Sequence, residues 1–139
     1  MNGHGEGSGK SRAMQSAVCE LFAAVSVADG DRARALFADD LRMELPFARP
    51  PFPTTRCGGD AIAVSLKASK GFFRDFRLTP TAFYPSPETN SIVVEANSNG
   101  ELSTGAQYSN QYVFIFTFVD GRIALWREYF DPLRLPDLA

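Results

Sequence analysis

Histidine is almost missing from this sequence, and its scarcity limits the chemistry that the chain can perform. The only histidine among the 139 residues is His4, which lies between glycines near the N-terminus. A Ser-His-Asp triad and most zinc sites need histidine beside other polar groups, so neither is expected. Cys19 and Cys57 are too few for a disulfide scaffold and lack metal-ligand spacing. We therefore expect no metal and no cofactor, and chemistry based on carboxylates, phenols and amides.

An excess of positive charge and long apolar runs are also lacking. The chain has 14 Lys+Arg against 16 Asp+Glu, a formal net charge of -2, so a basic surface for nucleic acid is not expected. No apolar run approaches the roughly 20 residues that cross a bilayer, and no signal-peptide pattern opens the sequence. We expect a cytoplasmic protein with neither nucleic acid nor membrane as a partner.

The glycine-rich start of the chain differs from the rest. Residues 1–12 contain almost nothing apolar, so they cannot offset the entropy lost on ordering, and we expect a disordered arm. We expect residues 13–139 to form a single domain. A chain of this length can build one good core but not two.

Beyond the arm, the hydrophobic pattern changes from helical spacing to strand alternation. Closely spaced prolines predict a stiff loop over residues 48–58. Helices that come first and strands that come last are typical of an α+β domain, with helices on one face of a mainly antiparallel sheet. The predicted elements are helices over 14–25, 29–37 and 60–73, and strands over 41–47, 76–84, 91–97, 106–119 and 122–130.

The last two predicted strands carry the strongest functional signal, because a carboxylate lies between large aromatic residues. Side chains two apart in a strand share a face. Glu128 therefore lies beside Trp126 and Phe130, and burial there should raise its pKa toward that of a general acid or base. The structural alternative is a glutamate in solvent or paired with an arginine. The even positions of the preceding strand are Tyr108, Asn110, Tyr112, Phe114, Phe116 and Phe118.

The turn between these two strands decides which residue lies opposite Glu128. A three-residue loop over residues 119–121 places Tyr112 across from Glu128, whereas a two-residue turn at Asp120 and Gly121 places Val113 there. We favour the longer loop because it brings the aromatic residues and Glu128 to one face. We then expect the Glu128 carboxyl to hydrogen-bond Tyr112 or Asn110.

Three segments together resemble one known superfamily. They are residues 108–116 (YSNQYVFIF), residues 120–123 (DGRI) and residues 127–132 (REYFDP). The sequence resembles the nuclear transport factor 2-like superfamily, and within it the SnoaL-like branch with its polyketide cyclases and phenazine-biosynthesis A/B proteins. The resemblance implies a cone-shaped α+β barrel, in which a curved sheet wraps around N-terminal helices and encloses a hydrophobic pocket. It also implies a homodimer formed through the sheet.

The resemblance places the acid/base of the cyclases at Glu128, but other family features are missing. The related ketosteroid isomerases carry a base before a proline on the first strand, where this chain has Leu45 before Pro46. Their oxyanion-hole aspartate corresponds to Phe114. The histidine of the phenazine-protein pattern is replaced by Gln111. Steroid isomerisation by that mechanism is therefore not expected.

Together these features predict a protein with a pocket for a small hydrophobic ligand. Our first interpretation is a cofactor-free isomerase, cyclase or dehydratase that acts on a hydrophobic carbonyl compound. The alternatives are a binding protein without chemistry and a dimerisation or scaffold domain whose pocket is filled. Arg49 and Arg56 flank the proline-rich loop, where they either attract an anionic substrate or are simply solvated. The predicted site consists of catalytic Glu128 and Tyr112, with Asn110, Trp126, Phe114, Phe116, Phe130, Phe47 and Leu45 as substrate-binding residues.

Overall fold

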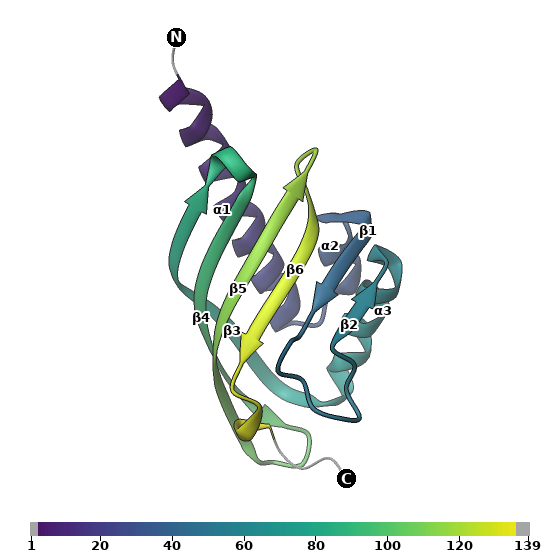
Figure 1. The fold of residues 1–139 in the computed structure, drawn as a ribbon. Coiled ribbons are helices and arrows are strands. Elements are labelled where there is room, and N and C mark those ends of the chain that lie inside the picture. Colours follow the sequence, from purple (N-terminus) through teal and green to yellow (C-terminus); the bar gives the residue numbers. More distant parts are fainter. Residues whose placement is uncertain (1–2, 136–139) are drawn as a thin grey trace.

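The computed structural model describes residues 3–135, in which helices precede a long run of strands (Figure 1). The element order agrees with the α+β class predicted from the sequence. The helices are α1 (Gly3–Ser26), α2 (Gly30–Arg34) and α3 (Gly59–Ala68); the strands are β1 (Phe37–Glu44), β2 (Thr55–Cys57), β3 (Phe73–Ser86), β4 (Ser91–Leu102), β5 (Gln107–Val119) and β6 (Arg122–Phe130). Three single turns of 3-10 helix are η1 (Ser69–Gly71), η2 (Pro87–Thr89) and η3 (Pro132–Arg134).

One curved sheet of six strands forms the framework, in the order β2-β1-β6-β5-β4-β3. All neighbouring strands are antiparallel except β1 and β6, which are parallel. The helices lie together on one face of the sheet, which we call the concave face, and the opposite face is the outer face (Figure 1). The α+β class and the mainly antiparallel sheet are confirmed. The sheet is open between β2 and β3, so the cone is not a closed barrel.

The ends of several elements differ from the sequence prediction because long-range pairing overrides local pattern. The second predicted helix was expected to run through Phe37, but α2 ends at Arg34 and Phe37 begins β1, where it pairs with Ile123 of β6. Within the predicted loop over 48–58, residues 55–57 form β2 because they pair with the end of β1. Each change adds a strand pairing that a single-segment pattern does not contain.

The N-terminal arm is a further correction. Disorder was expected for residues 1–12, but α1 begins at Gly3, so residues 3–12 are helical, and residues 1–2 lie outside the described residues. The helix lies against the turn between β3 and β4. A Cβ placed on Gly7 would lie 3.5 Å from Pro87, which is ordinary van der Waals contact. Arg12 also donates a hydrogen bond to Ser8, one helical turn earlier.

The core lies between α1 and the concave face of β4, β5 and β6. The apolar residues of α1 face the sheet, with Val18 and Leu21 fully inaccessible to solvent. Phe22 packs across the middle of the sheet, with its ring centroid 4.8 Å from that of Phe114 and 6.3 Å from that of Phe116. Aromatic pairs at these distances contribute about 0.5–1.5 kcal/mol each beyond burial of their area. This core fixes the concave face around which the site is built.

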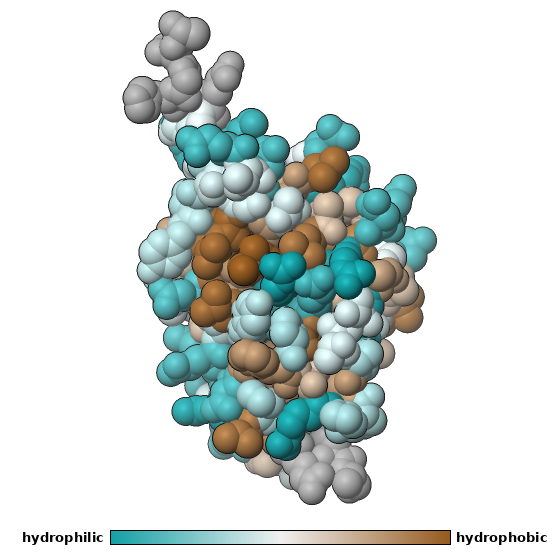
Figure 2. Space-filling view, viewed as in Figure 1, coloured by the Kyte–Doolittle hydropathy of each residue, from teal (hydrophilic) through white to brown (hydrophobic). Residues whose placement is uncertain are grey.

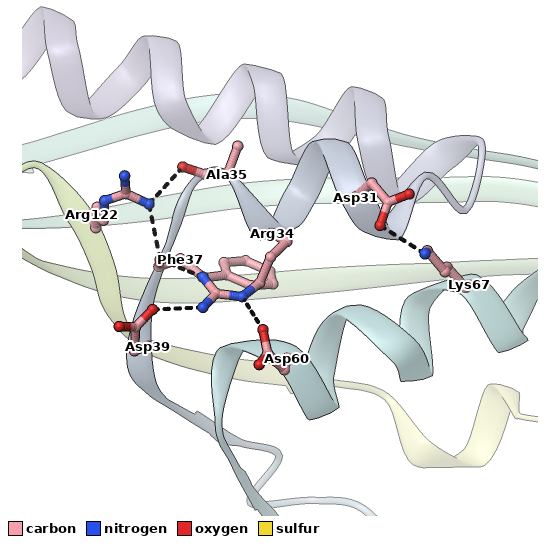
Figure 3. A network of polar contacts seen from close by, with 8 residues as sticks. All are labelled: Asp31, Arg34, Ala35, Phe37, Asp39, Asp60, Lys67 and Arg122. Atoms are coloured by element: carbon pink, nitrogen blue, oxygen red, sulfur yellow. Dashed lines mark hydrogen bonds and ion pairs between the residues drawn. The ribbon is translucent and has the colours of Figure 1, made fainter.

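Ion pairs attach the short helices to the edge of the sheet (Figure 3). The Arg34 guanidinium lies 2.6 Å from Asp39 of β1 and 2.7 Å from Asp60 of α3, and it donates to the carbonyl of Phe37 at 3.0 Å. These contacts hold α2, α3 and β1 in one arrangement. No helix within residues 3–135 is long and apolar enough to cross a membrane.

Candidate functional site

Strand β5 has one buried face and one exposed face, as the alternation of its residues predicted. Its even positions are buried from Tyr108 to Phe118, whereas the odd positions Gln107 to Val113 are exposed. The paired residues of β6 share this division, so Trp126 and Glu128 lie on the concave face. The prediction that Glu128 shares a face with the aromatic side chains is confirmed.

The residue opposite Glu128 is not the predicted one. Val119 pairs with Arg122, so Asp120 and Gly121 form a two-residue turn, with φ values of 51° and 77° that suit a type I′ turn. A β-bulge follows, because Phe118 pairs with Ile123 but Thr117 pairs with Leu125. The extra residue, Ala124, shifts the register.

Because of the bulge, even-numbered residues of β5 lie opposite even-numbered residues of β6, as expected. The register differs from the expected one by two residues. Phe114 therefore lies across from Glu128, and Tyr112 lies across from Phe130. The preference for a three-residue loop was wrong, and so was the pairing of Tyr112 with Glu128. Tyr112 remains a diagonal neighbour of Glu128 on the same face.

Glu128 is half-buried, and its one hydrogen-bond partner among the described residues is the Trp126 indole. The Trp126 N–H donates to Oε1 of Glu128 at 3.1 Å. The expected partners, Tyr112 and Asn110, form their hydrogen bonds with other groups and not with the carboxyl. Loss of hydration raises the pKa of Glu128 to about 7, and the Trp126 bond opposes this only in part. No lysine or arginine within residues 3–135 forms an ion pair with it.

The Tyr112 hydroxyl is buried on the concave face and lies 2.9 Å from the Ser98 hydroxyl of β4. Burial is the largest cause of a strongly raised pKa at Tyr112, and the negative charge of Glu128 adds to it. Tyr112 therefore stays protonated at neutral pH. It can act as a hydrogen-bond donor but not as a base.

Asn110 joins the end of β6 to β5 and uses its whole hydrogen-bonding capacity within the protein. Its amide nitrogen donates to the Tyr108 hydroxyl at 2.8 Å and to the Asp131 carbonyl at 3.0 Å. Its oxygen accepts from the backbone N–H groups of Gln111 at 2.8 Å and Asp131 at 3.0 Å. An amide offers two donors and one oxygen with two lone pairs. Asn110 is therefore a structural clamp, not a group free for substrate.

This clamp gives a stability prediction. Asn110→Ala should lower the free energy of unfolding by about 2–4 kcal/mol, because it leaves two backbone N–H groups without their acceptor in a poorly hydrated region. The matched change Asn99→Ala, at an exposed position of β4, should stay within about 0.5 kcal/mol of the wild type. Urea unfolding of the two variants measures the difference. Equal values would show that the Asn110 bonds do not hold β5 to the chain after β6.

The predicted apolar residues separate into two groups. Phe114, Phe116 and Trp126 are buried in the core, and Phe130 packs against it. Leu45 is half-buried just beyond the end of β1, where its N–H donates to the Thr54 carbonyl. Phe47 is 53% exposed, and its ring lies 5.3 Å from that of Tyr129 on the outer face. The structure therefore removes Phe47 from the predicted pocket wall, because the chain turns away from the sheet after Pro46.

The hollow on the concave face lies at the open end of the cone, between α3, η1 and the ends of β4 and β5. We call it the mouth cavity; its volume is about 430 Å³. Most of its wall is apolar, which is usual for a small-molecule site. Glu128 does not line it. The lining residues are Phe52, Arg56, Ser65, Ala68, Ser69, Phe72, Phe73, Leu102, Tyr108 and Leu135.

Tyr108 lines the mouth cavity on the same face of the sheet as Glu128, and it is the residue that the sequence-based site omitted. Its hydroxyl accepts the Asn110 amide, which leaves the phenolic proton free to donate. Burial raises the pKa of Tyr108, and the charge of Glu128 raises it further, so the two groups are electrostatically coupled. Its even position in β5 was the available signal, since Tyr108 and Tyr112 share that face.

The described residues contain no cluster of histidine, cysteine, aspartate or glutamate able to hold a metal ion. The chemistry that this part of the chain offers is therefore that of one weakly acidic carboxyl and two protonated phenols. These three groups share the concave face of β5 and β6 with the Ser98 hydroxyl of β4. A proton can be exchanged at Glu128, and an oxygen of a ligand can be hydrogen-bonded at Tyr108.

A helix-covered curved sheet with an apolar cavity at its open end defines a nuclear transport factor 2-like pocket fold. The sequence model of the SnoaL-like domain matches residues 18–126, and the chain belongs to this family. YesE of Bacillus subtilis, which is uncharacterised, is 27% identical over 99 residues, covering 70% of this chain and 67% of YesE.

Two solved structures show the same fold. A putative isomerase from Bacillus subtilis superposes with a TM-score of 0.78 at 25% identity, covering 89% of this chain and 90% of that one. A phenazine biosynthesis-related protein from Pseudomonas aeruginosa superposes with a TM-score of 0.79 at 19% identity, covering 99% of this chain and 96% of that one. The resemblance predicted from the last strands is confirmed. The family match ends at Trp126, two residues before Glu128, so it does not include the carboxyl.

Proposed function

We propose that the protein is a cofactor-free isomerase, cyclase or dehydratase that acts on a small hydrophobic carbonyl compound, with Glu128 as the acid/base. One observation carries the proposal: the Glu128 carboxyl lies on the concave face with a pKa of about 7 and no cationic partner among the described residues. A structural glutamate is usually held ionised by an arginine. A carboxyl that titrates near neutral pH can both accept and return a proton.

The proposed step is the transfer of a proton from carbon. Ionised Glu128 removes a proton from the carbon next to the carbonyl, and the electron pair of that C–H bond becomes an enolate. The Tyr108 phenol donates a hydrogen bond to the enolate oxygen, which stabilises the charge that develops there. Where a carbon–carbon double bond lies next to the deprotonated carbon, the enolate extends into a dienolate. Protonated Glu128 then returns the proton to the far carbon of that double bond, which moves the double bond into conjugation with the carbonyl, gives an isomer and restores the carboxylate.

Exchange of hydrogen for deuterium tests this proposal without knowledge of the natural substrate. In deuterated buffer, the protein should accelerate the loss of α-proton NMR signals from at least one member of a panel of cyclic apolar ketones. The rate should rise with pH through a midpoint near 7, because the carboxylate is the base. Binding of the ketones without any acceleration of exchange would overturn the proposal.

The second candidate function is ligand binding without chemistry, and the packing around Glu128 favours it. Phe114, directly across the sheet from Glu128, is fully buried, and the hydroxyl of Tyr112 and the amide of Asn110 are already hydrogen-bonded within the protein. The mouth cavity is lined by Tyr108 and not by Glu128. Ketones that bind but never exchange are the outcome expected of this function.

We also propose that the outer face pairs with a second copy of the chain. Val113 and Val119 of β5 are 38% and 56% exposed there, and Tyr84 of β3 is 54% exposed. Figure 2 shows this face, with apolar side chains gathered over the upper half of the sheet. A groove of about 480 Å³ crosses it between β3 and β6. Apolar patches of this kind mark association surfaces.

Light scattering during gel filtration tests the pairing. The wild type should have the mass of two chains, and Val113→Asp should have the mass of one, because a charge would be buried in the interface. Val64→Asp is the matched control: Val64 is 65% exposed but lies on α3, on the other side of the sheet. A wild-type mass of one chain at high concentration would contradict the pairing.

A further inference from the structure

The mouth cavity contains a cation whose charge is not neutralised by the described residues. Seven arginine and lysine side chains form ion pairs with carboxylates, and Arg56 is among those that form none within residues 3–135. Its one hydrogen bond there runs from Nη1 to the Ser65 hydroxyl at 2.5 Å. A guanidinium has five N–H donors, so four remain available.

The sheet places Arg56 on the same face as Glu128. Arg56 pairs with Met43 across β2 and β1, and Met43 pairs with Trp126 across β1 and β6. Directly paired residues point to the same side of a sheet, so all three face the cavity side. Arg56 is half-buried, whereas its neighbours Thr55 and Cys57 are exposed. Two strand spacings of about 4.8 Å each separate the backbone of Arg56 from that of Trp126.

The remainder of the cavity is built for an apolar body. Phe52 and Phe72 are 38% and 51% exposed, so two large rings stand at the rim without cover from the described residues. Phe73 and Leu102 continue the apolar wall inward toward Tyr108. Exposed rings around a concave apolar surface are the usual sign of a ligand that covers them.

We propose that the mouth cavity binds an organic carboxylate with an aromatic or alicyclic body. Arg56 binds the carboxylate through its free N–H groups, which match two carboxylate oxygens. The body packs against Phe72 and Phe73, and its far end reaches Tyr108. The proposed carboxylate site does not depend on Glu128 being a catalytic residue. Only the orientation of a reacting carbonyl toward Glu128 rests on the proposed function.

Calorimetry with two probes of similar shape tests the charge recognition. 2-Naphthoate should bind more tightly than the neutral 2-naphthylmethanol. Arg56→Gln should raise the dissociation constant of 2-naphthoate about 10- to 100-fold, as expected for loss of a charge-assisted pair. The dissociation constant of 2-naphthylmethanol should change by less than about 3-fold. Arg56→Lys keeps the charge but not the paired donors, so it should weaken the binding of 2-naphthoate less than Arg56→Gln does. It also keeps the test valid if the glutamine variant does not fold.

Arg49→Gln is the matched control, because Arg49 is an exposed arginine of the loop just before β2 and does not line the cavity. It should leave both probes unaffected. Equal binding of acid and alcohol to the wild type, failure of 2-naphthoate to bind, or equal loss of both probes in Arg56→Gln would each overturn the proposal. Glu128→Gln should still bind 2-naphthoate, so a failure of catalysis and a failure of carboxylate recognition give different results.

Discussion

Glu128→Gln is expected to lower the rate of proton exchange on an active ketone by about 10²–10⁴-fold, the usual contribution of a positioned acid/base. Glutamine has nearly the same shape as the neutral acid, and its carbonyl oxygen can still accept the Trp126 N–H that Glu128 accepts at 3.1 Å. Packing and the hydrogen bond are therefore preserved, while the carboxyl group that accepts and returns a proton is removed. The measurement is the loss of the α-proton NMR signal in deuterated buffer.

A second glutamate provides the control for this experiment. Glu88 lies exposed in η2, on the turn between β3 and β4, and Glu88→Gln should exchange protons at the wild-type rate. An unchanged rate in Glu128→Gln would remove Glu128 from the reaction. In that event the exposed glutamates and Tyr108 would need to be tested in turn, and ligand binding without chemistry would become the leading function.

The unfolding free energy of the wild type should fall as pH rises from about 4.5 to about 7. The pKa of Glu128 is about 7 in the folded chain against an ordinary value of 4.5, so the folded state binds more protons than the unfolded state in this interval. Stability is therefore highest below pH 4.5 for this group and is lost as pH rises through 7. One pKa unit corresponds to about 1.4 kcal/mol, so the expected loss is about 3 kcal/mol.

Comparison with Glu128→Gln isolates this single group from other titrations. Glu20, Asp39 and Glu44 have pKa values lowered by their arginine partners, and their effects on stability are common to both proteins. The variant should therefore gain about 3 kcal/mol on the wild type between pH 4.5 and 8, measured by urea unfolding at several pH values. Parallel curves for the two proteins would mean that the Glu128 carboxyl is hydrated like an ordinary one.

The period-2 pattern of β5 and β6 was enough to predict which face is buried. Alternation of Tyr112, Phe114 and Phe116 with smaller or polar residues depends only on neighbours in the chain, and burial follows it. The helical face of α1 was predictable for the same reason. These local patterns, with the motifs of the last strands, also sufficed to recognise the family.

The partner of Glu128 could not be predicted, because a β-bulge changes register without a change of pattern. Nothing in the sequence distinguishes Ala124 from other strand residues, yet it is the extra residue of the bulge. Because of it, Glu128 pairs with Phe114 and not with Tyr112. The displacement of Phe47 to the outer face and the pairing of β2 with β1 likewise depend on contacts between distant segments. Tyr108 was missed because its role as a lining residue depends on the mouth cavity, which the helices and the loop after β1 create.

Direct titration of the Glu128 carboxyl by carbon-13 NMR tests the central claim most closely. With labelled glutamate, the side-chain carboxyl signal that disappears in Glu128→Gln identifies the residue. A midpoint near pH 7 is the expected result, because loss of hydration on the concave face disfavours the charged form. A midpoint near the ordinary value of 4.5 would contradict it, since the Glu128 carboxyl would then be hydrated like an ordinary one and its pKa would not lie near neutral pH.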